Sequence, residues 1–316
     1  MRLRGTGLAR TIALLAVVGV TIGPGLALGH DGRPVPAPTL TTLATAWTLD
    51  PLPWLGMLIA AAAYLLALRR VNRAHPRSPF PRWRAACWLA GVALIGIALV
   101  SAVDAYADDL LTVHMLQHLL LALVAPPLLA LGAPITLALR AASPRFRRRW
   151  LLPILHARLT RAMTFPLVAW FAFALVMWAA HFTGWYEAAL ENAALHDAEH
   201  LAFLAAGALF WWPVVDADPS PARLNPGMRI VYLVLQMPVH TAIGLALYFA
   251  PAVLYPHYAA VQRAWGPDPL TDQQLAGILM WGAGDVWLLI AVAGVVAAWM
   301  QADARRARRA DARYST

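Results

Sequence analysis

The sequence predicts an all-α fold, a polytopic membrane bundle of seven transmembrane helices that follow an N-terminal signal-like segment. First, 60% of the 316 residues are hydrophobic and 13% are charged, against roughly 45–50% and about 25% in soluble domains. Second, seven segments approach the ~20 apolar residues that cross a ~30 Å bilayer core. Third, arginine is concentrated in alternate loops. These observations exclude an ordinary soluble enzyme.

The N-terminal 29 residues resemble a secretory signal. Three arginines among the first ten residues precede an apolar run over 11–28, and Ala27 and Gly29 have the small side chains of a cleavage site. Cleavage after Gly29 would leave His30 as the new N-terminus, where its amine and imidazole could chelate Cu(II). The alternative is an uncleaved first span. We expect a short outer segment over 30–52 to follow.

A membrane domain over 53–300 comes next. Its spans are predicted at 53–71, 85–103, 112–139, 165–182, 195–215, 229–251 and 273–300. The third span contains Pro126, Pro127 and Pro134, which predict either a kinked span or a span followed by a short interfacial helix. Gly282, Gly284 and Gly294 in the seventh span indicate close helix contacts rather than a phosphate-binding loop.

The basic residues predict the orientation of the bundle. All 25 are arginine, and 20 of them lie in the loops after the first, third and fifth spans or in the tail over 301–316. Because positively charged loops stay in the cytoplasm, the C-terminus is predicted inside and the mature N-terminus outside. The net charge of +9 therefore indicates topology, and we expect a bilayer rather than a nucleic acid as the partner. Most acidic residues fall on the opposite, outer side, as an acidic mouth.

Six of the ten histidines fall in the outer half of the predicted membrane domain. They are His114 and His118 on the third span, His181 on the fourth, His196 and His200 on the fifth, and His240 on the sixth. A separation of four residues places both imidazoles of a pair on one helical face. Two such pairs on separate helices predict a metal site, with Asp285 of the seventh span at a depth similar to that of His240.

Several metals suit this set of ligands. The single cysteine, Cys87, excludes multi-cysteine motifs. Met115, Met177 and Met237 each lie within four residues of a candidate histidine, and thioethers select Cu(I), which favours copper. Zinc would need about three ligands and a bound water, with Glu199 or Asp285 as general base. Haem would use one histidine from each of two facing helices, such as His118 and His200.

A structural alternative needs no metal. The histidines could instead bond one another, Gln117, Gln236 or backbone groups exposed by Pro126 and Pro238, and so hold the helices together. The remaining aromatic residues near span ends are predicted to form an interfacial belt. They are Trp150, Trp185, Trp211, Trp212, Trp265 and Tyr258.

The residues around the first histidine pair resemble a known family. The run HMLQHLLL over 114–121, continued by VAPPLL over 124–129 and LGAP over 131–134, is similar to the signature of the multi-span cytochrome c oxidase assembly factors of the caa3 type, called CtaG. WTLDP over 47–51, HDAEH over 196–200 and QMPVH over 236–240 fit the same family. The resemblance spans roughly 47–300.

This resemblance implies a protein of the bacterial plasma membrane that is needed for a functional copper-haem oxidase. It implies an oxidase subunit as partner and His114, His118, His196, His200 and His240 as candidate site residues. The leading hypothesis is a non-enzymatic metallochaperone that receives copper from the outer side. One alternative is an intramembrane zinc hydrolase, although the seventh span lacks the histidine that such enzymes use. The other is a copper permease, although no comparable ligands continue to the inner side.

Overall fold

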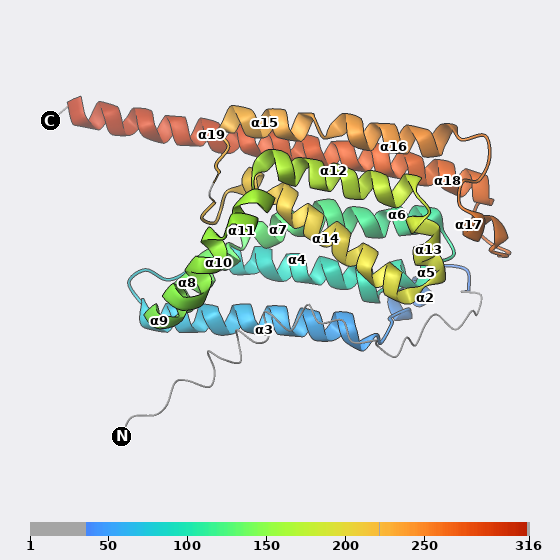
Figure 1. Ribbon diagram of the computed structural model, residues 1–316, viewed down its shortest axis with the longest axis horizontal. Coiled ribbons are helices and arrows are strands. Elements are labelled where there is room, and N and C mark those ends of the chain that lie inside the picture. The colour runs from blue at the N-terminus through green and yellow to red at the C-terminus, as the bar shows by residue number, and fades with distance from the viewer. Residues whose placement is uncertain (1–35, 221, 315–316) are drawn as a thin grey trace, which may run out of the picture.

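A computed structural model describes residues 36–220 and 222–314. The predicted signal-like segment and His30 lie outside the described residues. Within them the chain forms helices and no strand, and the long helices run side by side in one bundle (Figure 1). The predicted all-α polytopic fold is confirmed.

Six helical segments are long and apolar enough to cross a membrane, or seven if one bent pair counts as a span. The six are α3 (Pro51–Ala74), α4 (Arg82–Val100), Leu111–Ala141, α14 (Ala193–Val215), Pro226–Phe249 and Pro269–Asp311. The predicted fourth span is α12 (Pro166–Phe182), which is bent by 67° from α13 (Trp185–Glu191).

Shorter elements make up or connect these segments. The segment Leu111–Ala141 contains α6 (Leu111–Leu119), the π-helical η1 (Leu120–Val124), α7 (Ala125–Leu131) and α8 (Pro134–Ala141). The later segments contain α15 (Pro226–Val234), α16 (Met237–Phe249), α18 (Pro269–Ile278), η3 (Leu279–Ala283) and α19 (Gly284–Tyr314). The connections hold α2 (Leu40–Thr45), α5 (Ala102–Ala107), α9 (Pro144–Phe146), η2 (Arg147–Leu151), α10 (Leu152–His156), α11 (Arg158–Met163) and α17 (Pro256–Ala260).

The third span ends as a membrane helix followed by a short separate helix. Ala133 has a left-handed backbone with φ of 48°, which breaks the helix between α7 and α8. Asp218 then accepts hydrogen bonds from the backbone N–H groups of Ile135 at 3.1 Å and Thr136 at 2.6 Å. These bonds satisfy the donors that a helix start leaves unpaired, and α8 packs against α3.

Several span ends differ by a few residues from their predicted positions, among them those of the second and seventh spans. The second span stops at Val100, because the Ser101 hydroxyl accepts a bond from Val103 N–H at 3.1 Å and starts α5. The seventh span extends from α18 through η3 into α19, so that the predicted tail continues as helix to Tyr314. In Figure 1 this end of α19 projects beyond the other helices.

Of the three predicted contact glycines, Gly284 alone has neighbours, since a Cβ there would lie 3.5 Å from Cδ2 of His240. A Cβ on Gly282 or Gly294 would have no neighbour within 4 Å. By contrast, a Cβ on Gly244 of α16 would lie 2.7 Å from the carbonyl oxygen of Gly277 of α18. Gly207 of α14 faces the carbonyl oxygen of Ala122 of η1. Small residues let backbones approach in this way. The two contacts hold α16, which carries His240, and α14, which carries His196 and His200, close to their neighbours.

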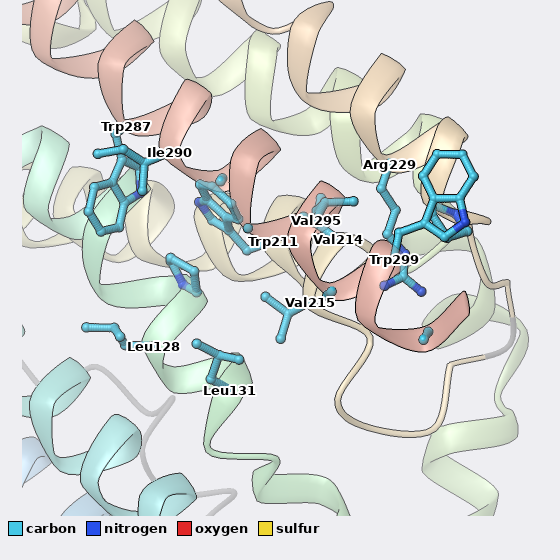
Figure 2. Close-up of a pocket in the computed structure, with 16 residues that line it drawn as sticks. Leu128, Leu131, Trp211, Val214, Val215, Arg229, Trp287, Ile290, Val295 and Trp299 are labelled. Carbon is cyan, nitrogen blue, oxygen red and sulfur yellow. The ribbon is translucent and has the colours of Figure 1, made fainter. Parts of the chain in front are cut away.

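A cavity of about 490 Å³ lies between α7, α14, α15 and α19 (Figure 2). Trp211, Trp287 and Arg229 are among its lining residues. The assignment of Trp211 to an interfacial belt is wrong, because its ring is buried inside the bundle. The cavity adjoins the end of α14 opposite to His196 and His200, so it does not belong to the histidine site.

Candidate metal centre

The start of α6 positions His114 and His118. The buried carboxylate of Asp272 on α18 accepts hydrogen bonds from Leu111 N–H and Thr112 Oγ1, each at 2.7 Å. The guanidinium of Arg263 lies 3.9 Å from the same carboxylate. Asp272, on a helix that is distant in sequence, thus caps α6 and fixes its first turn just before the first histidine.

Replacing Asp272 by alanine is expected to lower the free energy of unfolding by about 2 kcal/mol, because α6 loses its cap and buried Arg263 loses its carboxylate partner. Denaturant unfolding of the purified protein in detergent measures this change. Asp268→Ala is the matched control, since Asp268 caps α18 from an exposed position, and it should have the smaller effect. An equal loss in both variants would contradict the structural role of Asp272.

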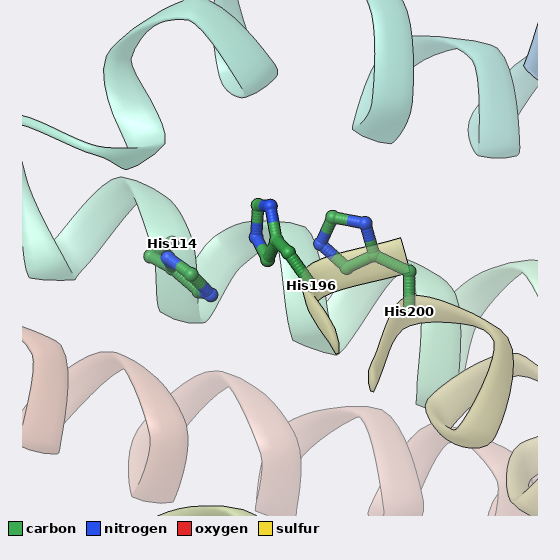
Figure 3. A group of neighbouring side chains, drawn as sticks. All are labelled: His114, His196 and His200. Carbon is green, nitrogen blue, oxygen red and sulfur yellow. The ribbon is translucent and has the colours of Figure 1, made fainter. Parts of the chain in front are cut away.

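The side chains of α6 meet those of α14 in one cluster (Figure 3). The Nε2 atoms of His114 and His118 are 2.9 Å apart. Ring centroids are 5.3 Å apart for His114 and His196, and 4.2 Å apart for His196 and His200. The donor atoms of His114, His196 and His200 all lie within 4.8 Å of one another, as do those of His114, His118 and Glu199. Two sets of three donors therefore share His114.

His181 joins this cluster from the end of α12. Its ring centroid lies 6.1 Å from that of His118, and its Nε2 lies 3.3 Å from Sδ of Met115. The structure thus brings five of the six candidate histidines together, with one of the three candidate methionines. Met115 approaches His181 of another helix. The sequence had predicted instead that it approaches the histidines next to it on α6.

His240 belongs to neither set of donors among the described residues. Its ring centroid lies 5.9 Å from that of Phe173, and its Nδ1 lies 3.4 Å from the carbonyl oxygen of Gln236. Asp285, predicted at a similar depth, accepts a hydrogen bond from Thr241 Oγ1 at 2.8 Å. Neither His240 nor Asp285 therefore belongs to a set of three donors among the described residues.

Hydrogen bonds at Nδ1 fix the tautomers of two of these histidines. Nδ1 of His181 lies 2.6 Å from the carbonyl oxygen of Met177, which can only accept, so Nδ1 carries the proton. Tyr258 donates its hydroxyl proton to the carbonyl of Ala107 at 2.8 Å, and its oxygen lies 2.9 Å from Nδ1 of His114. Nδ1 of His114 is therefore also the donor, and each Nε2 presents a lone pair.

The cluster contains buried polar atoms that no described residue satisfies. Glu199 is fully buried, neither of its carboxylate oxygens has a hydrogen-bond partner, and Oε2 lies 4.0 Å from Nε2 of His118. His118 Nδ1 and His200 Nε2 are also buried without hydrogen-bond partners. Such groups are costly in an apolar interior. A cation held between Glu199 and the imidazoles would compensate for this cost.

The structural alternative matches the contacts in part. Nε2 of His114 lies 2.9 Å from Nε2 of His118, and Nδ1 of His181 bonds the backbone carbonyl of Met177, but the two glutamine side chains do not take part. Gln117 donates from Nε2 to the carbonyl of Ala98 at 2.9 Å and to Asp104 at 3.1 Å, so its amide faces α4 and α5. The side-chain nitrogen and oxygen of Gln236 are buried without hydrogen-bond partners among the described residues. Neither glutamine contacts the imidazole cluster through a hydrogen bond that the structure describes.

Sequence reasoning missed the role of the segment around α17. Tyr258 was assigned to the interfacial belt, but it is 1% exposed and contacts His114. Burial raises the pKa of its phenol well above the usual value, so the hydroxyl stays protonated. Backbone N–H of His257 donates to Glu187 at 2.9 Å, and Nε2 of His257 lies 2.9 Å from the carbonyl of Asp108. These contacts fold α17 over the cluster.

Four carboxylates of the predicted acidic mouth cap helices. Asp50 accepts from Leu52 N–H at 2.9 Å at the start of α3, and Asp268 does the same for α18 with Leu270 N–H at 3.1 Å. Asp272 caps α6, and Glu187 holds α17. The carboxylate nearest to the histidines is instead Glu199, which is buried within the cluster.

Comparison with known proteins identifies the family. Residues 62–302 match the family described as cytochrome c oxidase caa3 assembly factor. Uncharacterized proteins of Mycobacterium bovis and Mycobacterium tuberculosis are each 30% identical over 291 residues, which cover 90% of this chain and 43% of theirs. A third, from Mycobacterium leprae, is 30% identical over 291 residues, which cover 90% of this chain and 44% of that protein.

The chain therefore spans less than half the length of the curated relatives that it matches. No solved structure matches it. The family match includes every histidine of the cluster and most of the described bundle. The chain therefore belongs to the cytochrome c oxidase caa3 assembly factor family.

Proposed function

We propose that this protein binds copper in the cluster of His114, His118, His196, His200 and Glu199 and delivers it to a caa3-type cytochrome c oxidase during assembly. Copper is the cargo in this proposal, and the protein is not an enzyme. The observation that supports it best is the convergence of donor atoms from α6 and α14 in two sets, each within 4.8 Å. One set contains the buried carboxylate of Glu199, which has no hydrogen-bond partner among the described residues.

Copper is favoured over zinc by the thioether of Met115, which lies 3.3 Å from Nε2 of His181. A haem between His118 and His200 is not favoured. The ring of His114 lies 4.4 Å from that of His118 and 6.5 Å from that of His200, so it occupies space that the porphyrin would need. Zinc hydrolysis stays the second candidate, because His114, His196 and His200 form a three-histidine set beside Glu199.

The proposed orientation places the cluster on the outer side of the plasma membrane. In Figure 1 the arginine-rich segments α8 to α11 and the end of α19 lie at one end of the bundle, whereas α13, α17 and the start of α6 lie at the other. Arginine-rich loops stay in the cytoplasm. The metal cluster would then receive copper from outside, and the C-terminus would be cytoplasmic.

Deletion of the gene tests this function in the bacterium that encodes it. We expect the purified oxidase from the deletion strain to lack copper, and a plasmid copy of the wild-type gene to restore it. Measuring copper and haem per oxidase separates a failure of copper insertion from a loss of oxidase protein. An oxidase that is fully loaded with copper in the deletion strain would contradict the proposal.

Tyr258→Phe is expected to weaken copper binding by about 10- to 100-fold, the usual cost of removing a partner that orients a ligating histidine. The change removes the oxygen that accepts from Nδ1 of His114 and keeps the buried ring. Competition with a chelator measures the affinity. The matched control is Tyr255→Phe, because the hydroxyl of Tyr255 donates to the backbone carbonyl of His181 rather than to an imidazole. Equal affinities in both variants would show that Tyr258 does not position His114.

A further inference from the structure

We propose that Met115 and His181, together with His118, form a second copper position that is selective for Cu(I). This position would lie beside the imidazole set of His114, His196 and His200. The proposal rests on the proposed function and deepens it: the cluster would hold its cargo in two successive positions that differ in chemistry.

The contact between Met115 and His181 is not a hydrogen bond between neutral groups. Nδ1 of His181 donates a hydrogen bond to the carbonyl of Met177 at 2.6 Å, so Nε2 faces the sulfur with a lone pair. The thioether sulfur has no proton to offer. Two electron-pair donors therefore lie 3.3 Å apart, with Met115 fully buried and His181 4% exposed.

This separation suits two ligands of one metal ion. Metal–nitrogen bonds of about 2.0 Å and metal–sulfur bonds of about 2.3 Å place the two donors of a tetrahedral ion about 3.5 Å apart. The observed 3.3 Å between Nε2 and Sδ is close to that length. A small movement of the flexible methionine side chain would admit the ion.

His118 connects the two positions. Its Nε2 lies 2.9 Å from Nε2 of His114 and 4.0 Å from Oε2 of Glu199, and its ring centroid lies 6.1 Å from that of His181. His114 in turn belongs to the imidazole set. An ion that exchanges one ligand at a time can pass along these shared residues without ever losing all of its donors.

Exposure and ligand softness give this path a direction. His196 is partly exposed, whereas His118, Met115 and His181 are buried. Imidazoles accept several divalent metals and both copper ions, while a thioether selects Cu(I). The imidazole set, which is partly exposed at His196, would therefore accept copper, and the buried position would retain only Cu(I). The buried carboxylate of Glu199 would balance the charge of the ion between them.

X-ray absorption at the copper edge tests the second position. Full-length protein in detergent is loaded without oxygen with Cu(I) supplied from a chelator. We expect sulfur scattering at about 2.3 Å in the wild type and its loss in Met115→Leu, a substitution that conserves volume. The affinity for Cu(I) should fall at least tenfold in this variant, whereas Cu(II) bound by the imidazole set should keep its electron paramagnetic resonance spectrum.

Met280→Leu is the matched control, because Met280 is an equally buried methionine in η3, and it should keep the sulfur scattering. Bound Cu(I) with only nitrogen and oxygen neighbours in the wild type would overturn the second position and leave the proposed function standing. Wild-type protein that binds no copper would overturn the proposed function itself. The wild-type spectrum decides between these results even if Met115→Leu does not fold.

Discussion

Replacing His118 and His200 together by alanine is expected to abolish copper binding and to leave the oxidase without copper. The double change removes one donor from each set of three, since His200 belongs with His114 and His196, and His118 belongs with His114 and Glu199. Loss of an orienting partner alone costs 10- to 100-fold in affinity. Loss of two ligands should therefore weaken binding by more than about 100-fold.

The matched control for this variant is the double change His75→Ala and His156→Ala. His75 is exposed after α3, and His156 ends α10 with its Nδ1 2.8 Å from the carbonyl of Leu152. This control removes two histidines and should keep copper in both the purified protein and the oxidase. Normal oxidase copper in the His118 and His200 variant, at a normal amount of folded protein, would contradict the proposed site.

The second large effect is expected from Gly207→Ala, which should destabilise the bundle by about 3 kcal/mol and weaken copper binding with it. A Cβ at Gly207 would collide with the carbonyl oxygen of Ala122 and lie 2.9 Å from Cγ of Pro126. The carbonyl belongs to the backbone and cannot rotate away, so α14 must move from η1 and α7. His200 lies seven residues earlier on the same face of α14, and it would move away from His118.

Gly56→Ala is the control for this substitution. A Cβ at Gly56 of α3 would have no neighbour within 4 Å, so the change should be neutral or should stabilise the helix by up to about 1 kcal/mol. Thermal unfolding in detergent measures both variants, and Cu(I) competition reports the site. Equal unfolding midpoints for the two alanine variants would contradict the close contact at Gly207.

The helical spans and the two histidine pairs could be predicted because they depend on local periodicity. An apolar run of span length and a separation of four residues each imply their geometry within one helix. The pair His114 and His118 lies on one face of α6, with Nε2 atoms 2.9 Å apart. Even the break in the third span was among the predicted alternatives, since Pro134 begins α8.

Contacts between helices could not be predicted in the same way. Met115 meets His181 because α6 packs beside the end of α12, and Tyr258 reaches His114 because α17 folds back from a loop. The depth of His240 along its helix predicted that it lies near the other histidines. Depth does not determine which way the ring points, and in the structure the ring lies beside Phe173. The π-helical turn η1 directly after α6 also follows no hydropathy pattern, although such turns are frequent at functional sites.

The metal content of the purified full-length protein tests the central claim most directly. The protein is produced in a medium with both copper and zinc, and bound metals are measured by mass spectrometry together with the His118 and His200 double variant. We expect at least one copper ion per chain in the wild type, little zinc, and no copper in the variant. Zinc in place of copper, or copper that persists in the variant, would contradict this claim.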